Sequence, residues 1–215
     1  MRNLVAAALL ILISASDGAY SREPIAGLPC EGCEAVFEGL PKNLAPTSRI
    51  ASRGEPGQPM TVTGRVYGPD RKPRAGVIIY AYQTNTRGIY PAPPKPLGRA
   101  SDRHGQLRGW VLTDANGRYT FETIRPASYP TRDVPAHIHM HVIERQCATY
   151  YIDDIMFTDD PLLTPEERQR HRAGRAGNGI ATPTRKDGRW RVTRDIQLGS
   201  NIPGYPKCGG RRAAT

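Results

Sequence analysis

Residues 112–124 read LTDANGRYTFETI, and this stretch carries the clearest signal of the fold. Segments of strand-forming residues lie on either side of Asn116 and Gly117. An Asn-Gly pair between such segments supplies the positive φ angles that a tight hairpin turn requires. After the turn, Tyr119 and Phe121 alternate with polar residues, as in a strand with one buried face. The stretch therefore predicts a strand, a tight turn and a second strand.

Further strand signals lie on both sides of this unit. Residues 60–67 alternate between apolar and polar with a period of two, and the continuous apolar run at 76–82 is typical of a buried strand. The same kind of reading predicts later strands at residues 137–145, 150–158 and 190–198.

Only residues 164–172 resemble a helix. Thr164 stands at the capping position, Pro165 at the first helical position and Glu167 at the capping-box position. Many short strands separated by turn signals favour an all-β protein. The fold class we predict is a β-sandwich of mainly antiparallel strands, with an extended N-terminal arm and long loops.

The first residues resemble a secretory signal peptide. Arg2 precedes an apolar run at 4–13, and small residues follow at 14–19. The run is short for crossing a bilayer, so a retained membrane anchor is the weaker alternative. We therefore expect residues 1–19 to be a signal peptide, the protein to be secreted or periplasmic, and no stable membrane anchor to remain.

The rest of the chain divides by composition. Residues 20–58 are rich in Gly, Pro and Ser without a sustained pattern, and we interpret them as an extended N-terminal arm. The expected sandwich occupies residues 59–200, and residues 201–215 form a C-terminal tail. This is the size of one decorated domain.

Four cysteines remain after the leader, at positions 30, 33, 147 and 208. An even number in an exported chain favours two disulfides, for which three connectivities exist. We expect Cys30 or Cys33 to reach Cys147 or Cys208. Half of a zinc site at Cys30 and Cys33 is a weaker reading, because no second nearby pair completes it.

The formal net charge is +10, and basic residues cluster between 168 and 194. Aromatic residues are few and are not interleaved with the charges, as they often are on nucleic-acid-binding surfaces. A solvated basic surface is the preferred interpretation, and no nucleic-acid partner is expected.

The candidate site begins at residues 135–141, PAHIHMH. Residues two apart on a strand share a face, so His137 and His139 would present two imidazoles side by side. Two histidines alone would suit zinc or copper. If Tyr90 and Tyr129 join them, the phenolate oxygens add hard, charged donors that favour Fe(III). Each residue alone has a structural reading; the combination predicts a metal site, with His141 in its surroundings or in the core.

These motifs resemble the intradiol ring-cleavage dioxygenases, the family of protocatechuate 3,4-dioxygenase and catechol 1,2-dioxygenase, and especially a smaller group of secreted members. The resemblance covers about residues 60 to 162, in the family's order and spacing. The matching pieces are Gly64-Arg65-Val66, Ala81-Tyr82-Gln83, Gly88-Ile89-Tyr90, TDANGRY at 113–119, FETIRP at 121–126, Tyr129-Pro130, PAHIH at 135–139, and residues 157–161.

The resemblance implies a β-sandwich and a non-haem Fe(III) centre. Tyr90 and His137 would be the equatorial ligands, and Tyr129 and His139 the axial ligands. The two tyrosines would also be the catalytic residues, with Tyr129 displaced when a catechol chelates the iron and accepting one of its protons. With O2 as second substrate, the ring would open between its two oxygenated carbons to give a cis,cis-muconate-type diacid. Neither the particular catechol nor the oligomeric state follows from the sequence.

The chain departs from the family pattern near the site. Val134 stands where an arginine usually precedes the Pro-x-His-x-His segment, with Arg132 two residues earlier. Asp154 stands where a glutamine is usual. Residues 91–108 are basic and Pro-rich, which implies an unusually open substrate pocket. These changes bear on substrate and turnover more than on iron binding.

Two other functions fit parts of the sequence. Residues 61–124 also resemble the prealbumin-like repeats, which would make the protein a non-catalytic secreted binding module. That pattern does not require Tyr90, Tyr129, His137 or His139. A third possibility is a metal site that serves sequestration or redox sensing. The four candidate ligands together favour the enzyme.

Overall fold

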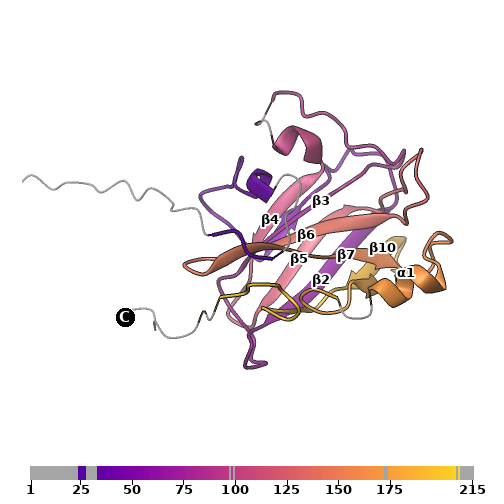
Figure 1. Ribbon diagram of the computed structural model, residues 1–215. Coiled ribbons are helices and arrows are strands. Elements are labelled where there is room, and N and C mark those ends of the chain that lie inside the picture. Colours follow the sequence, from indigo (N-terminus) through magenta and orange to yellow (C-terminus); the bar gives the residue numbers. More distant parts are fainter. Residues whose placement is uncertain are drawn as a thin grey trace, which may run out of the picture.

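The computed structural model describes residues 24–27, 33–96, 98, 100–171, 174–206 and 208. The expected signal peptide lies outside these residues. The strands form two sheets that face each other across an apolar core, which confirms the predicted β-sandwich. Figure 1 shows the strand layers, with the helix α1 (orange) at one margin. Within the described part of the chain, no helix is both long and apolar enough to cross a membrane.

The first sheet contains six strands. Its path is β1-β5-β2-β10-β9, and β11 also pairs with β2. The strands are β1 (Thr47–Arg49), β2 (Pro59–Tyr67), β5 (Arg118–Ile124), β9 (Thr184–Lys186), β10 (Arg189–Thr193) and β11 (Ile196–Gln197). β2 and β5 are antiparallel, whereas β1, β10 and β11 add parallel pairs.

The second sheet has the order β4-β3-β6-β7-β8. Its strands are β3 (Ile78–Gln83), β4 (Arg108–Leu112), β6 (His137–Glu144), β7 (Ala148–Phe157) and β8 (Ile180–Ala181). The four long strands pair in antiparallel fashion, and β8 adds a short parallel pair.

Strand alternation decides which side chains enter the core. On β6, Ile138, Met140 and Val142 face the first sheet and belong to the main core. The residues between them face the other way, so His137 and His139 lie on the outer side of the sandwich. A second apolar cluster on that outer side includes Tyr80 and Tyr82.

The stretch at 112–124 does not form a paired hairpin. β4 pairs with β3 in the second sheet, whereas β5 pairs with β2 in the first. The tight turn exists, since Gly117 donates its N–H to the Asp114 carbonyl at 2.9 Å and has φ of 71°. Each strand buries its apolar face against the opposite sheet, so the turn connects the two layers instead of two neighbours in one layer.

The segment before β2 contains regular structure as well as extended chain. The 3-10 helix η1 (Cys33–Val36) places Val36 in the outer apolar cluster, and the Trp110 indole N–H donates to its carbonyl at 2.8 Å. A second 3-10 helix, η2 (Ser101–His104), buries His104 on the same side of the sheet. Residues far from β6 in sequence thus cover the sheet beside the candidate ligands.

The predicted helix is confirmed as α1 (Pro165–Arg170). Thr164 caps it by accepting a hydrogen bond from the Glu167 N–H at 3.3 Å, and Pro165 takes the first helical position. The predicted helix extended to residue 172, which lies outside the described residues.

The disulfide expectation is wrong for this chain. Cys147 is bonded to Cys208, so neither is available to Cys30 or Cys33. Cys33 is itself disulfide-bonded, and Cys30 lies outside the described residues. The bridge joins the turn after β6 to the C-terminal segment. This pairing could not be predicted from the sequence, because it depends on which cysteines the fold brings together.

Candidate metal centre

The candidate ligands gather on the outer face of the second sheet. His137 and His139 stand at the start of β6 on the face that points away from the core, as their spacing predicts. The Tyr82 ring on the neighbouring strand stacks on the His139 ring, with 4.4 Å between ring centroids. His141, expected near the site or in the core, is buried among aromatic rings of the same face.

The two tyrosines come from loops that touch each other. Tyr90 follows a turn in which the Gly88 N–H donates to the Asn85 carbonyl at 3.1 Å. Gly88 has φ of 72°, and a Cβ there would lie 1.9 Å from the carbonyl oxygen of Ser128. Only glycine permits this approach. It brings the loop that carries Tyr90 against the loop that carries Tyr129.

All four predicted ligands converge through their donor atoms. The Tyr90 hydroxyl lies 2.6 Å from the Tyr129 hydroxyl and 2.8 Å from His139 Nε2. The Tyr129 hydroxyl lies 3.1 Å from His137 Nε2 and 3.4 Å from His139 Nε2. The two Nε2 atoms are 3.1 Å apart. Residues that span almost fifty positions of sequence thus aim two oxygens and two nitrogens at one point.

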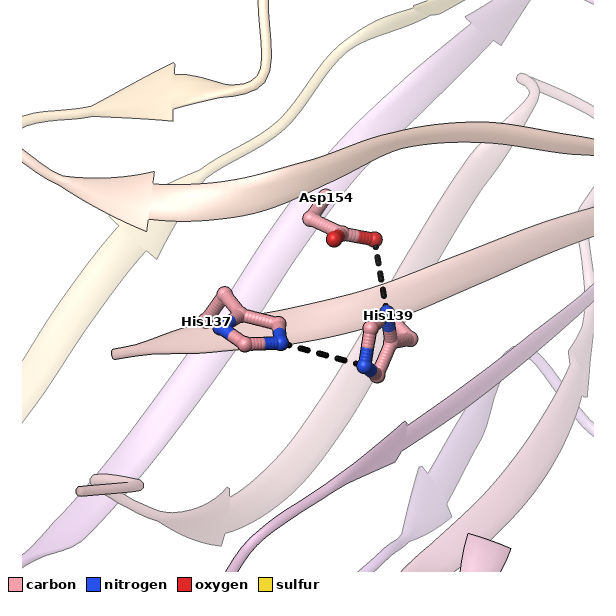
Figure 2. A group of neighbouring side chains, drawn as sticks. All are labelled: His137, His139 and Asp154. Carbon is pink, nitrogen blue, oxygen red and sulfur yellow. Dashed lines mark hydrogen bonds and ion pairs between the residues drawn. The ribbon is translucent and has the colours of Figure 1, made fainter. Parts of the chain in front are cut away.

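The remaining ring nitrogens define the proton positions. His137 Nδ1 donates to the Pro135 carbonyl at 2.7 Å, and His139 Nδ1 donates to Asp154 Oδ1 at 3.0 Å. A neutral imidazole has one N–H, so each Nε2 then presents a lone pair. Figure 2 shows the two rings turned toward each other in this way, with Asp154 behind His139.

This arrangement fits a cation. The four donor atoms make five close contacts with one another, but only the two phenolic hydroxyls carry a proton that could form a hydrogen bond there. The two Nε2 atoms face each other with a lone pair on each. A metal ion at the centre would turn these contacts into favourable ones. Two neutral imidazoles with two phenolate oxygens form a donor set whose hard, anionic part suits a trivalent ion such as Fe(III).

A break in the β6–β7 ladder aims Asp154 at the site. Ile138 pairs with Ile155, but Met140 pairs with Ile152, so β7 holds one extra residue between these pairs. Such a bulge reverses the alternation of the strand. Ile152 and Ile155 both face the core, and the carboxylate of Asp154 reaches the outer face.

The position of Asp154 suits an orienting residue better than a ligand. His137, His139 and Asp154 could by themselves hold a metal ion, since one donor atom from each lies within 4.8 Å of the others. However, Asp154 contacts the Nδ1 side of His139, behind the ring, whereas both tyrosine hydroxyls contact Nε2. Histidine ligands commonly donate their second N–H to a carboxylate in this way.

Burial governs the ionisation of the site. Burial, with the nearby His139, lowers the pKa of His137 and keeps its imidazole neutral, as metal binding requires. Burial also raises the pKa of Tyr90 and of Tyr129. Burial alone would raise the pKa of Asp154, but the positive charge that His139 carries when it is protonated, together with the hydrogen bonds from His139 and Tyr151, holds it at about 2, so this carboxyl stays ionised.

The loop before β6 carries the departures from the expected pattern. Val134 is half-buried. The Arg132 guanidinium carbon lies 6.0 Å from the centroid of the Tyr129 ring, which is within reach of a cation–π interaction. The sequence did not assign a role to the Pro135 carbonyl or to Tyr82. No side-chain motif reveals the first, and the continuous apolar run of β3 does not show which of its residues face the site.

Comparison with known proteins agrees with this geometry. A sequence model of the family described as Dioxygenase matches residues 41–172. The chain is 32% identical over 123 residues to the protocatechuate 3,4-dioxygenase beta chain of Burkholderia cepacia, which covers 54% of this chain and 52% of that protein. It is 30% identical over 160 residues to catechol 1,2-dioxygenase 1 of Acinetobacter lwoffii, covering 63% and 50%. The chain spans about half the length of these relatives.

Solved structures share the fold. Catechol 1,2-dioxygenase from Pseudomonas arvilla C-1 superposes with a TM-score of 0.57 at 20% identity, covering 90% of this chain and 65% of that one. The dioxygenase domain of a carbohydrate-binding fusion protein from Streptomyces sp. SirexAA-E gives 0.53 at 23%, covering 82% and 98%. An intradiol ring-cleavage dioxygenase from Tetranychus urticae gives 0.52 at 21%, covering 85% and 95%.

Proposed function

Because this chain belongs to the intradiol ring-cleavage dioxygenase family, we propose that it is a non-haem Fe(III) enzyme that cleaves catechol-type rings with O2. The products would be cis,cis-muconate-type diacids. The observation that supports this most is the convergence of the Tyr90, Tyr129, His137 and His139 donor atoms on one point.

In this proposal the four side chains hold the metal. Iron bound there would act as a Lewis acid, favouring the deprotonated form of a catechol and making its ring reactive toward O2. The Pro135 carbonyl and the Asp154 carboxylate accept the Nδ1 protons of His137 and His139, which fixes both rings and leaves each Nε2 to face the metal.

Tyr129 is the residue that accepts a proton from the substrate. Both tyrosines stand on loops, unlike the histidines on β6, but Tyr90 packs against the outer apolar cluster, whereas Tyr129 is half-buried and does not belong to that cluster. A loop side chain can swing away from a metal with less strain than a strand side chain. The phenolate oxygen of Tyr129 is therefore the base that would accept a proton from a catechol hydroxyl as the substrate binds.

The residues around the four candidate ligands influence which substrate binds, through packing and charge. The Tyr82 ring covers one side of His139 and excludes water from it. Arg132 supplies a positive charge beside Tyr129, where negative charge would move during the reaction. A cation at this distance compensates in part for the valine at position 134.

The test combines iron loading with a substrate panel. The purified protein, loaded with Fe(III), should show a visible phenolate-to-iron charge-transfer band, and an anaerobic catechol should shift it. Under air, catechol, a carboxylated catechol and hydroxyquinol should be compared for O2 uptake and for the ultraviolet absorption of the diacid product. If the protein takes up iron but consumes no O2 with any of these compounds, the metal site is supported and the enzymatic proposal is refuted. A protein that stays colourless and iron-free would favour the prealbumin-like binding module.

We also propose that the protein is secreted or periplasmic. The hydrophobic leader in the sequence and the disulfide between Cys147 and Cys208 support this, because disulfides persist mainly in oxidising compartments. Fractionation of cells that express the full chain, with N-terminal sequencing of the product, tests it; intact leader in the cytoplasmic fraction would contradict it.

A further inference from the structure

The outer face of the first sheet lies on the side of the sandwich opposite the candidate metal centre. Its strands align side chains in rows. One row consists of four threonines on four strands, Thr47, Thr120, Thr63 and Thr193. The next row is Arg49, Glu122, Thr61, Arg191 and Thr184. Two pairs, Arg65 with Arg118 and Lys186 with Arg189, complete what we call the basic face.

The basic face carries six positive side chains and one carboxylate. Glu122 is paired with Arg49. Within the described part of the chain, the other five, Arg65, Arg118, Lys186, Arg189 and Arg191, form no ion pair. The carboxylates next to Arg65 and Arg118 accept hydrogen bonds from backbone N–H groups. Asp195 accepts one from the Arg65 N–H at 2.9 Å, and Asp114 accepts one from the Arg118 N–H at 2.7 Å.

The arrangement works against the stability of the free protein. Arg65 lies directly opposite Arg118, and Lys186 lies directly opposite Arg189. Like charges in directly opposed positions destabilise a sheet. The register places Arg189 six residues along the strands from the level of Arg65, so an extended anion lying on this face could contact both pairs. The repulsion is a reason to expect a negatively charged partner of that length.

We propose that the basic face binds a linear anionic polysaccharide. Neighbouring strands lie about 4.8 Å apart, so the threonine row offers hydroxyl groups at regular intervals across the sheet. Each hydroxyl can donate and accept, as the hydroxyl groups of sugars do. The arginine and lysine side chains on both sides of the threonine row supply positive charge that can pair with carboxylate or sulfate groups along the polymer.

The same rows disfavour nucleic acid as the partner. Single strands bind where aromatic side chains stack on successive bases, and none of the residues in these rows is aromatic. Duplex DNA is read by an element that enters a groove, whereas this surface is the middle of a sheet. The threonine hydroxyls and the isolated cations suit a sugar polymer better.

The test compares two triple variants that lose the same charge. Arg65→Gln/Arg118→Gln/Arg191→Gln removes cations from the basic face. Lys42→Gln/Arg53→Gln/Lys72→Gln removes three exposed cations outside these strands. Binding of the full protein to polygalacturonate should weaken about tenfold at low salt in the first triple and change little in the second. Fully methyl-esterified polygalacturonate should not bind.

Folding and metal loading provide the controls. The first triple should unfold at the same or a higher temperature than the parent, because a repulsive pair has been removed. Its iron content should be unchanged, since the metal centre is on the other side of the molecule, so this proposal can fail while the dioxygenase proposal stands. Equal losses in both triples, equal binding of the esterified polymer, or tighter binding of duplex DNA or phosphatidylserine vesicles at matched charge would overturn it.

Discussion

Replacing Asp154 by Asn should weaken iron binding without unfolding the protein. The carboxylate accepts the His139 Nδ1 proton at 3.0 Å and is brought there by the bulge in β7. Asn has the same shape, and its carbonyl oxygen can accept the same proton. The substitution therefore removes the charge of the orienting group and leaves its position.

The expected magnitude follows from the kind of hydrogen bond that changes. A hydrogen bond to a charged group contributes about 1.5–3 kcal/mol, and a neutral one about 0.5–1.5 kcal/mol. The difference between the midpoints of these ranges, roughly 1.2 kcal/mol, corresponds to about an eightfold weaker affinity. Asp154→Ala also frees the His139 ring to rotate, so the loss should approach about 100-fold, the upper end for orienting partners of metal ligands.

A competition titration measures this. Each protein is equilibrated with Fe(III) in a buffer of a chelator of known affinity, and bound iron is followed by the visible charge-transfer band. Asp159→Asn is the matched control, because Asp159 is five residues away, is paired with Arg125 at 2.6 Å and has a 43% exposed side chain. Thermal unfolding of the metal-free proteins checks that all of them fold.

The reasoning would be refuted by an Asp154→Asn protein that binds iron as tightly as the parent. It would also be refuted if Asp159→Asn weakened binding to the same extent, because the effect would then reflect net charge alone. An Asp154→Ala protein no weaker than Asp154→Asn would show that the hydrogen bond does not orient the ring.

Four further outcomes are expected. Tyr90→Phe should abolish the visible band and oxygen uptake while the fold remains, because the phenolate is both ligand and chromophore; full turnover would sink the assignment. Arg132→Gln should slow turnover by about tenfold at unchanged iron content, since it removes the cation beside the Tyr129 ring, as steady-state kinetics would show. Cys147→Ser should lower stability by up to about 4 kcal/mol, given the sequence separation of 61, without loss of iron, and an unchanged denaturation midpoint would contradict it. Burial raises the pKa of Glu144 despite the hydrogen bonds that it accepts from Tyr150 and Tyr205. The free energy of unfolding should therefore fall as the pH rises from the ordinary pKa of a glutamate through the raised pKa of Glu144. Glu144→Gln should remove that fall, as denaturation curves measured at acidic and neutral pH would show.

Local chemistry determined most of the element types and the pairing of the two candidate histidine ligands. Alternation along β6 places His137 and His139 on one face whatever surrounds the strand. The cap of α1 depends only on Thr164 and the residues just after it, so it too was predictable. The two candidate tyrosine ligands were identified by the resemblance of spaced motifs to the family, since neither loop has a pattern of its own.

The tertiary structure alone decided how these pieces combine. It sends the strands around Gly117 into different sheets, closes the disulfide between Cys147 and Cys208, and presses the Gly88 turn against Ser128. It also inserts the bulge that turns Asp154 toward His139. Each of these features depends on contacts between residues far apart in the chain, and the free energy of such contacts is fixed only when both sheets and their loops have closed around the same core.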